Sequence, residues 1–276
     1  MPLNSYLGRM HKFLGRSTMI TRIAVKARNQ ASAVISAHFS DVDGPAENGE
    51  YALIDLIAPD ADNFIDVGGN VGEWSARFLS RMTGVRQGLI VDANSDCVHT
   101  LRKRFGEYRN VRILDAALSD YSGNSRFFEA PGSASALSTL TTPSRKMSAV
   151  MARSVRVTTL DDEVAALGWD RVSMLKIDAE GHDLFVLRGA RQLLSERKVD
   201  FVQFECNSTW YPVGVSIVAA NAFLESVGYR IFQLAREGLR TIDIDYYGSC
   251  GSANWVAIHD RSPERGLRLL GSNSVD

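Results

Sequence analysis

The sequence predicts an α/β protein with a mostly parallel central sheet, preceded by a helical extension. Three observations carry this prediction. Five apolar runs of strand length recur along the chain, and each ends on an acidic residue. Stretches with helical apolar spacing separate them, as in repeated strand-helix units. The stretch 63–74, NFIDVGGNVGEW, has the pattern of a buried strand, a tight glycine turn and the start of a helix.

Length and charge limit the organisation of the chain. A chain of 276 residues with 45% hydrophobic content can bury one large core. We therefore expect one catalytic domain over 50–260, an extension and linker over 1–49, and a flexible tail over 261–276. The net charge of -1 gives no general attraction to polyanions, so no nucleic-acid partner is expected.

Cysteine spacing and hydropathy favour a cytoplasmic protein. The three cysteines, Cys97, Cys206 and Cys250, form no C-x-x-C pair, which is typical of reduced thiols and argues against a zinc site or a disulfide framework. No apolar run is long enough to span a bilayer, and the N-terminus lacks the apolar core of a signal peptide.

The first forty residues predict one or two basic amphipathic helices. They contain no Asp or Glu, and their apolar residues recur at helical spacing. We favour a helical cap that packs on the sheet domain, and the loop 41–50 as a linker. A peripheral contact with an anionic membrane or substrate and a transit peptide are the alternatives. The basic residues are Arg9, Lys12, Arg16, Arg22, Lys26 and Arg28.

The glycine turn after the first strand suits a cationic ligand. A dinucleotide site needs G-x-G-x-x-G, whereas this chain has G-G-x-x-G, and Asp66 precedes its first glycine by two residues. A carboxylate there would repel a phosphate and attract an ammonium or a sulfonium group, both of which S-adenosylmethionine carries. A tight turn with no ligand is the alternative.

The next two strands, 88–92 and 110–115, also end on acids. We expect Asp92 to accept hydrogen bonds from both ribose hydroxyls of an adenosine, although it could equally cap the helix predicted over 95–105. Asp115 is placed to accept from the exocyclic amine of adenine.

Later segments predict a lid and an acidic strand exit. The Ser/Thr-rich stretch 131–148 is a candidate substrate lid. The fourth strand, 172–177, leaves Asp178 and Glu180 at its end, where they could hold a methionine ammonium, position a substrate hydroxyl, bind a divalent cation or merely cap a helix. The remaining predicted elements are a strand over 200–205, a helix over 217–227, a strand over 229–234, a turn into 240–244 and a last strand over 253–258.

Together these motifs resemble the FkbM family of S-adenosylmethionine-dependent methyltransferases over about 50–260. The resemblance implies a Rossmann-like class I methyltransferase fold, with a seven-stranded, mostly parallel sheet and an antiparallel edge hairpin. It implies O-methylation of a hydroxyl, often on a sugar or polyketide. The motifs are IDVGGNVG (65–72), AALSD (116–120), VTTLD (157–161), KIDAEGHD (176–183) and LRGA (187–190).

By position in the family pattern, seven residues would line the cofactor: Asp66, Gly68, Asn70, Gly72, Asp92, Asp115 and Asp178. Two departures leave the geometry open. The family commonly has Glu-Pro where this chain has Asp92-Ala93, and it commonly has Glu where Asp183 stands.

A sulfonium methyl is already activated, so aligning the acceptor oxygen provides most of the rate. The candidates for a general base are Asp178, Glu180, His182 and Glu205. No metal is expected, and the acceptor is a small molecule, a glycan or a lipid-linked sugar. A non-catalytic S-adenosylmethionine or nucleotide-binding module is the main alternative. An NAD-dependent oxidoreductase is disfavoured by the glycine spacing and the lack of a Tyr-x-x-x-Lys pair.

Overall fold

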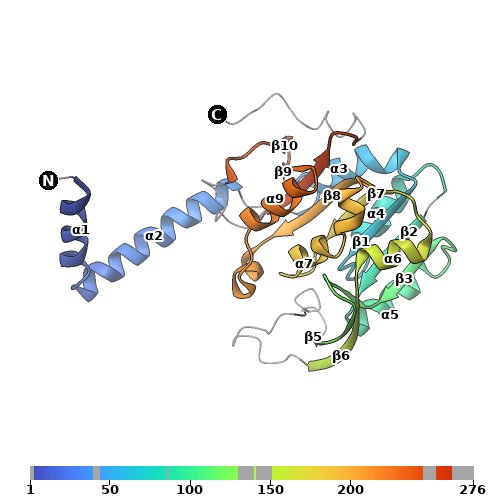
Figure 1. Cartoon of the computed structure of the whole chain (residues 1–276), viewed down its shortest axis with the longest axis horizontal. Coiled ribbons are helices and arrows are strands. Elements are labelled where there is room, and N and C mark those ends of the chain that lie inside the picture. The colour runs from blue at the N-terminus through green and yellow to red at the C-terminus, as the bar shows by residue number, and fades with distance from the viewer. Residues whose placement is uncertain are drawn as a thin grey trace.

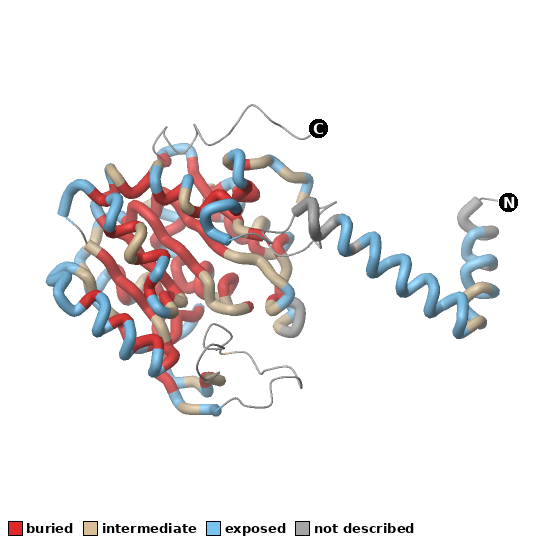
Figure 2. Tube along the Cα trace, turned by 180° about the vertical axis from the view of Figure 1, so that it is seen from behind, coloured by how far each residue is buried: buried red, intermediate tan, exposed pale blue. Residues whose placement is uncertain are grey.

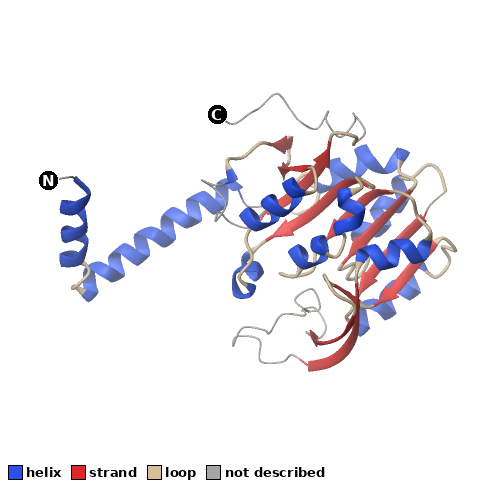
Figure 3. Ribbon diagram, viewed as in Figure 1, coloured by secondary structure: helices blue, strands red, loops and turns tan. Residues whose placement is uncertain are grey.

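The computed structural model describes residues 3–39, 44–85, 87–129, 140, 151–244 and 253–262. An eight-stranded sheet lies at the centre, with helices on both faces (Figures 1 and 3). Its strands are β1 (Asn63–Val67), β2 (Gln87–Asp92), β3 (Val111–Asp115), β7 (Val172–Ile177), β8 (Val199–Cys206), β9 (Tyr229–Ala235), β10 (Gly238–Arg240) and β11 (Ala253–His259). The helices of this domain are α3 (Glu50–Ile57), α4 (Glu73–Arg81), α5 (Ser95–Phe105), α6 (Leu160–Leu167), α7 (Asp183–Arg188), α8 (Arg191–Ser195) and α9 (Ile217–Ser226), with short 3-10 turns η1 (Ala58–Asp60) and η3 (Ser208–Val213).

The strand order is β10-β9-β11-β8-β7-β1-β2-β3. Strands β3, β2, β1, β7 and β8 run parallel, and β11 pairs antiparallel with both β8 and β9. The predicted mostly parallel sheet with an antiparallel edge is therefore confirmed. The short strand β10 is an eighth strand beyond the seven expected, and it lies at Gly238–Arg240 rather than over the predicted 240–244.

Both faces of the sheet are buried, which explains why its strands are continuously apolar. Side chains alternate along β1: Ile65 and Val67 join the core with α6 to α9, whereas Phe64 joins the core with α3, α4 and α5. Asp66 follows the same alternation and points to the Phe64 face. The first strand thus sets an acid inside the protein beneath α4.

A second, small sheet has the order β4-β6-β5, with β4 (Ala117–Leu118), β5 (Gly123–Glu129) and β6 (Met151–Thr158). It has its own apolar cluster, in which Phe127 packs with Ala93, Ala117, Val155 and Val157. Of the predicted lid, 131–148, only Leu140 lies within the described residues, and it packs against this cluster.

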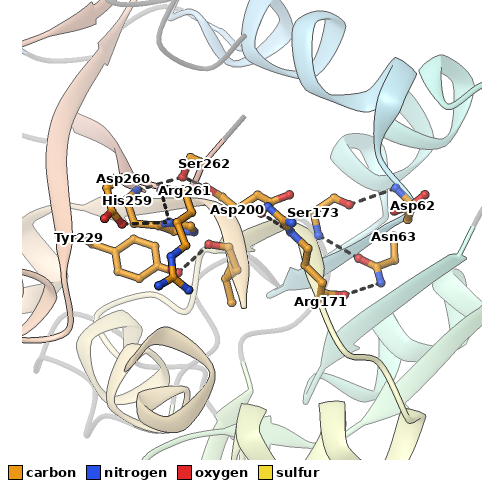
Figure 4. Close-up of polar contacts among 11 residues, drawn as sticks. Asp62, Asn63, Arg171, Ser173, Asp200, Tyr229, His259, Asp260, Arg261 and Ser262 are labelled. Carbon is orange, nitrogen blue, oxygen red and sulfur yellow. Dashed lines mark hydrogen bonds and ion pairs between the residues drawn. The ribbon is translucent and has the colours of Figure 1, made fainter. Parts of the chain in front are cut away.

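The amino ends of the central strands are held by a polar network (Figure 4). Asn63 donates to the carbonyl of Arg171 at 2.8 Å and accepts from the amide of Ser173 at 2.9 Å. Ser262 donates to the carbonyl of Asp200 at 2.6 Å and is itself buried. The ordered domain therefore extends at least to Ser262, past the predicted start of the tail; 263–276 lie outside the described residues.

The N-terminal segment forms two helices, α1 (Leu3–Leu14) and α2 (Thr18–Phe39), as the apolar spacing predicted. They project away from the domain (Figure 1), and their described side chains are almost all exposed (Figure 2). The expected cap packed on the sheet is therefore wrong. Periodicity showed that each helix has an apolar face, but it could not show what covers that face. No helix in the described part of the chain is both long and apolar enough to span a bilayer.

Candidate active site

Two adjoining cavities open at the carboxyl ends of β1, β2 and β7. We call the first the apolar cavity, because aliphatic and aromatic side chains form most of its wall. Its lining is Val67, Gly68, Asn70, Val91, Asp92, Ala93, Ala116, Ala117, Leu118, Phe127, Leu140, Asp178, Ala179, Glu180 and His182. This is the sheet edge at which open α/β folds bind ligands.

We call the second the acidic cavity, because five carboxylates and one lysine line it. These are Glu50, Asp66, Glu73, Asp178, Glu205 and Lys176. Gly68, Asn70 and Asp178 line both cavities, so the two form one continuous site around the glycine turn. The sequence predicted that strand-end acids would gather at one rim, and most of them do.

The glycine turn is fixed by close backbone contacts. Gly68 has φ 78°, and a Cβ built there would lie 1.9 Å from the carbonyl oxygen of Asp178. Its amide donates to the carbonyl of Val91 at 2.9 Å, and Asn70 also has a positive φ, 48°. Gly68 is therefore required where the chain passes from β1 across the loop after β7.

Gly72 lines neither cavity, so the structure does not bring it together with the other predicted cofactor residues. It precedes α4 with φ 80°, and a Cβ there would meet Phe105 at 2.4 Å and Leu101 at 2.9 Å. Without a side chain, Gly72 lets the start of α4 lie close to Phe105 and Leu101 of α5.

Asp92 organises the rim of the apolar cavity. One carboxylate oxygen accepts from the amide of Asn70 at 2.8 Å, and the other accepts from the amide of Asn94 at 2.7 Å. Asn94, not Asp92, caps α5, since its side chain accepts from the amides of Asp96 and Cys97. Burial raises the pKa of Asp92 to about 6, against the lowering effect of these amide contacts. Each oxygen keeps a lone pair for a ligand hydroxyl.

Asp66 lies fully buried below the glycine turn. One oxygen accepts from the hydroxyl of Ser75 at 2.5 Å, and the other is 3.9 Å from the ammonium of Lys176. Burial raises the pKa of Asp66, and Lys176 opposes that rise. The oxygen that faces Lys176 has no hydrogen-bond partner among the described residues.

Lys176 lines the acidic cavity and was not among the site residues predicted from the sequence. It is buried between Asp66 and Asp178, and it donates to Asp178 at 3.2 Å. Burial alone would lower the pKa of Lys176, but Asp178, Asp66 and Glu50 outweigh burial and raise it. A lone lysine in the apolar run VSMLKI was the available signal, because a buried lysine requires acidic partners.

Asp115 lies outside the site, contrary to prediction. Its side chain is 41% exposed and forms ion pairs with Arg102 at 3.7 Å and Arg153 at 3.6 Å. Among the described residues, the cavity wall after β3 is formed by Ala116, Ala117 and Leu118 instead. Asp115 pairs with Asp92 in the sheet, but its carboxylate is engaged by the two arginines rather than directed into the cavity.

The loop after β7 and the end of β8 hold the other predicted acids. Burial raises the pKa of Glu180 to about 8, and Asp178 and Glu205 add to the rise. Burial likewise raises the pKa of Glu205 to about 8, with Asp178 adding to it. Asp183 accepts hydrogen bonds from the amides of Ala179 and Gly181 at 3.3 and 3.2 Å, so its carboxylate fixes the backbone of this loop. Burial raises its pKa to about 7.

His182 borders the apolar cavity from the start of α7. Its Nε2 lies 2.9 Å from the hydroxyl of Ser119, and its ring stacks on Phe185 with centroids 4.5 Å apart. Burial lowers the pKa of His182 to about 4, although Asp120 opposes this, so the ring is neutral at pH 7. Among the described residues, no three His, Cys, Asp or Glu side chains are grouped as metal ligands.

Comparisons with known proteins point to one family. A model of the methyltransferase FkbM domain matches residues 66–231, which is more than half of the chain. No curated protein matches the chain.

Solved structures with similar folds include two methyltransferases and a protein solved with bound S-adenosyl-L-methionine. Methyltransferase FkbM from Methylobacillus flagellatus KT has a TM-score of 0.47 and 15% identity, and the match covers 72% of this chain and 44% of that one. The chain therefore spans less than half the length of that protein. Precorrin-6y C5,15-methyltransferase from Geobacter metallireducens GS-15 has a TM-score of 0.42 and 12% identity, with 76% and 87% covered. Aeropyrum pernix fibrillarin, solved with S-adenosyl-L-methionine, has a TM-score of 0.40 and 13% identity, with 82% and 74% covered. All three scores lie below 0.5, so the domain match alone decides the family.

Proposed function

We propose that this chain, which belongs to the FkbM family of methyltransferases, methylates a hydroxyl oxygen of an uncharged, hydroxyl-rich acceptor. Such an acceptor would be a sugar, a glycan or a polyketide, and the methyl donor is S-adenosylmethionine. The observation that carries this proposal is the continuity of the two cavities around Gly68, Asn70 and Asp178. One cavity has the walls for a nucleoside, and the other has the acids for a cationic group.

The residues present fit the donor. Apolar side chains and the Asp92 carboxylate suit an adenosine, since carboxylate oxygens accept from ribose hydroxyls. The buried oxygen of Asp66 lacks a hydrogen-bond partner among the described residues, and it lines the acidic cavity together with Asp178. These two acids would hold the ammonium and favour the sulfonium, because opposite charges attract strongly in a poorly hydrated site.

Held by these residues, S-adenosylmethionine would supply an activated methyl group for transfer to the acceptor oxygen, and S-adenosylhomocysteine would be the other product. The task of the protein is to orient that oxygen, exclude water and take the hydroxyl proton.

We assign to Glu180 the role of the general base, which takes the proton of the acceptor hydroxyl. It lines the apolar cavity, and its pKa is raised further by Asp178 and Glu205, which line the acidic cavity, so Glu180 lies close to the junction where donor and acceptor would meet. A base with a pKa near the working pH combines an adequate ionised fraction with good proton affinity. His182 is neutral at pH 7, but its Nε2 contacts Ser119, which suits an orienting role. Asp178 touches both cavities and would sit between donor and acceptor.

The acidic cavity supports an uncharged acceptor. Five carboxylates face one lysine there, so a phosphate or carboxylate group entering the cavity would meet repulsion. Hydroxyl groups would instead find acceptors for their hydrogen bonds. The same charge balance disfavours a nucleic-acid acceptor.

Release of S-adenosylhomocysteine from S-adenosylmethionine tests the function. The wild-type protein is assayed with panels of neutral glycosides, the corresponding sugar phosphates and polyketide alcohols. Acceptor-dependent release with a neutral panel, and a loss of about 100-fold in kcat for Glu180→Gln with unchanged donor affinity, is expected. Donor binding without release for any acceptor would indicate the non-catalytic binding module instead.

A further inference from the structure

The N-terminal arm, α1 and α2 with the turn between them, carries an apolar surface that the domain does not cover. It projects from the domain (Figures 1 and 2), and α2 alone, with 22 residues, is about 33 Å long at 1.5 Å per residue. Phe13 is 72% exposed, Met19 71% and Ile23 55%. Side chains of this size are normally buried, so their exposure calls for a partner.

The exposed apolar side chains form one stripe on each helix. In α1, the exposed Leu7 and Met10 and the half-buried Leu14 recur every three or four residues, with the exposed Phe13 beside them. In α2 the stripe follows the same spacing and consists of Met19, Ile20, Ile23, Ala24, Ala27, Ala31 and Val34. Val25 is exposed too, but it lies on the opposite side of α2, among polar residues.

The other face of the arm is basic. Lys12, Arg22, Lys26 and Arg28 are exposed, and 1–40 contain no acidic residue at all. Two arms of this composition would repel one another, so a second copy of the chain is a poor partner. A surface that accepts apolar side chains and also carries negative charge is complementary to both faces.

We propose that the N-terminal arm lies on an anionic lipid bilayer, with the apolar stripes in the boundary between headgroups and acyl chains and the basic residues against the headgroups. Arg22, Lys26 and Arg28 interrupt α2, so the helix rests on the membrane rather than crossing it. The domain would then work close to a membrane surface.

Vesicle co-sedimentation of the full-length protein tests this proposal. Vesicles of phosphatidylcholine alone are compared with vesicles that also contain phosphatidylglycerol. Binding to the anionic vesicles that weakens as sodium chloride is raised is expected, because each basic residue near the surface is worth roughly fivefold in partitioning.

Matched variants distinguish binding through the apolar stripes from non-specific adsorption to the vesicles. Phe13→Ser combined with Ile23→Ser should weaken binding by roughly 100-fold, at about tenfold for each large apolar side chain. Val25→Ser removes an exposed apolar side chain from the polar face and should leave binding unchanged. Unaltered thermal midpoints show that the domain remains folded in all variants. Equal binding by the double variant and the wild type would overturn the proposal. So would absence of binding to anionic vesicles together with concentration-dependent dimers in sedimentation velocity.

Discussion

At the scale of single residues, Lys176 has the most constrained surroundings. It is buried beside Asp66 and Asp178, with Glu50 nearby, and its charge offsets acids that would otherwise repel one another. Breaking a buried ion pair by removing one partner leaves an uncompensated charge, which costs about 3 to 5 kcal/mol.

Lys176→Met should therefore lower the free energy of unfolding by about 3 kcal/mol in urea titrations at pH 7. The loss should shrink at low pH, because protonated carboxyls no longer need a cation. Lys198→Met is the matched control: that lysine lies at the surface in a pair with Glu196, so no measurable change is expected. A Lys176→Met protein as stable as the control would contradict the role assigned to this lysine.

Asp92 tests the nucleoside end of the site. Asp92→Ala removes the proposed acceptor for the ribose hydroxyls and the anchor for the amides of Asn70 and Asn94. Isothermal titration calorimetry should show affinity for S-adenosylmethionine reduced by roughly 10- to 100-fold, as expected for lost hydrogen bonds to a charged group. Asp92→Glu keeps the carboxylate that the family commonly has there and should recover most of the affinity. Normal binding by the alanine variant would rule out this contact.

The raised pKa values of Glu180 and Glu205 predict a pH-dependent stability. Both groups bind protons more tightly in the folded protein, at a pKa of about 8, than in the unfolded chain. Their stabilising contribution is thus complete below about pH 4.5 and is lost as the pH rises through 8. Without cofactor, the thermal midpoint should fall by on the order of 5 °C between pH 5 and pH 9.

Replacing both acids by glutamine should make that fall shallower, since glutamine has no proton to lose. The slope that remains is expected from Asp183, Asp92 and Asp66, whose pKa values burial also raises. Glu196→Gln, which alters an exposed acid, should leave the profile as in the wild type. A double variant whose midpoint falls as steeply as that of the wild type would show that other groups cause the loss.

At the scale of elements, the junction of β1 with the loop after β7 forms the site. A methyl group at Gly68 would enter the carbonyl of Asp178, and φ 78° disfavours any other residue. Gly68→Ala should cost about 2 to 4 kcal/mol in denaturant unfolding and abolish measurable donor binding. Gly84→Ala meets no atom within 4 Å and should be neutral in both measurements. Full donor affinity in Gly68→Ala would mean that this close approach does not shape the site.

Sequence periodicity predicted these elements well where packing follows local pattern. The helix over 95–105 and the strand ending at Asp92 are found as expected, because each has a clear apolar face and a clear end signal. Helix α3 was missed at the end of the expected linker, although Asn48 and Glu50 are already buried there. Their burial depends on Gln203, which lies far away in the sequence and donates to Glu50 at 3.0 Å.

The site could be predicted only in part for a similar reason. Strand-end position correctly brought Asp66, Asp92, Asp178 and Glu180 to one rim. It could not tell that Arg102 and Arg153 pair with Asp115 outside the cavity lining, or that side chains of α5 fill the space beside Gly72. Such outcomes depend on neighbours that only the tertiary structure supplies.

At the scale of the whole molecule, the chain combines a methyltransferase domain with a projecting basic arm. The domain contains one continuous site, in which the apolar cavity lies toward β2 and the acidic cavity lies toward α3. The arm carries exposed apolar stripes far from that site (Figure 1). Methyl transfer is therefore assigned to the domain and membrane binding to the arm, and the two proposals can be tested separately.

The central claim is that the joined cavities hold the methyl donor with its adenosine in the apolar cavity and its amino acid end toward the acidic one. A crystal structure of the protein with S-adenosylhomocysteine tests this most directly. We expect the ribose hydroxyls within hydrogen-bonding distance of Asp92 and the amino group beside Asp178 and Asp66. Density for the ligand at another edge of the sheet, or a ligand in the cavities with its ribose turned away from Asp92 and its amino group away from the acids, would contradict it.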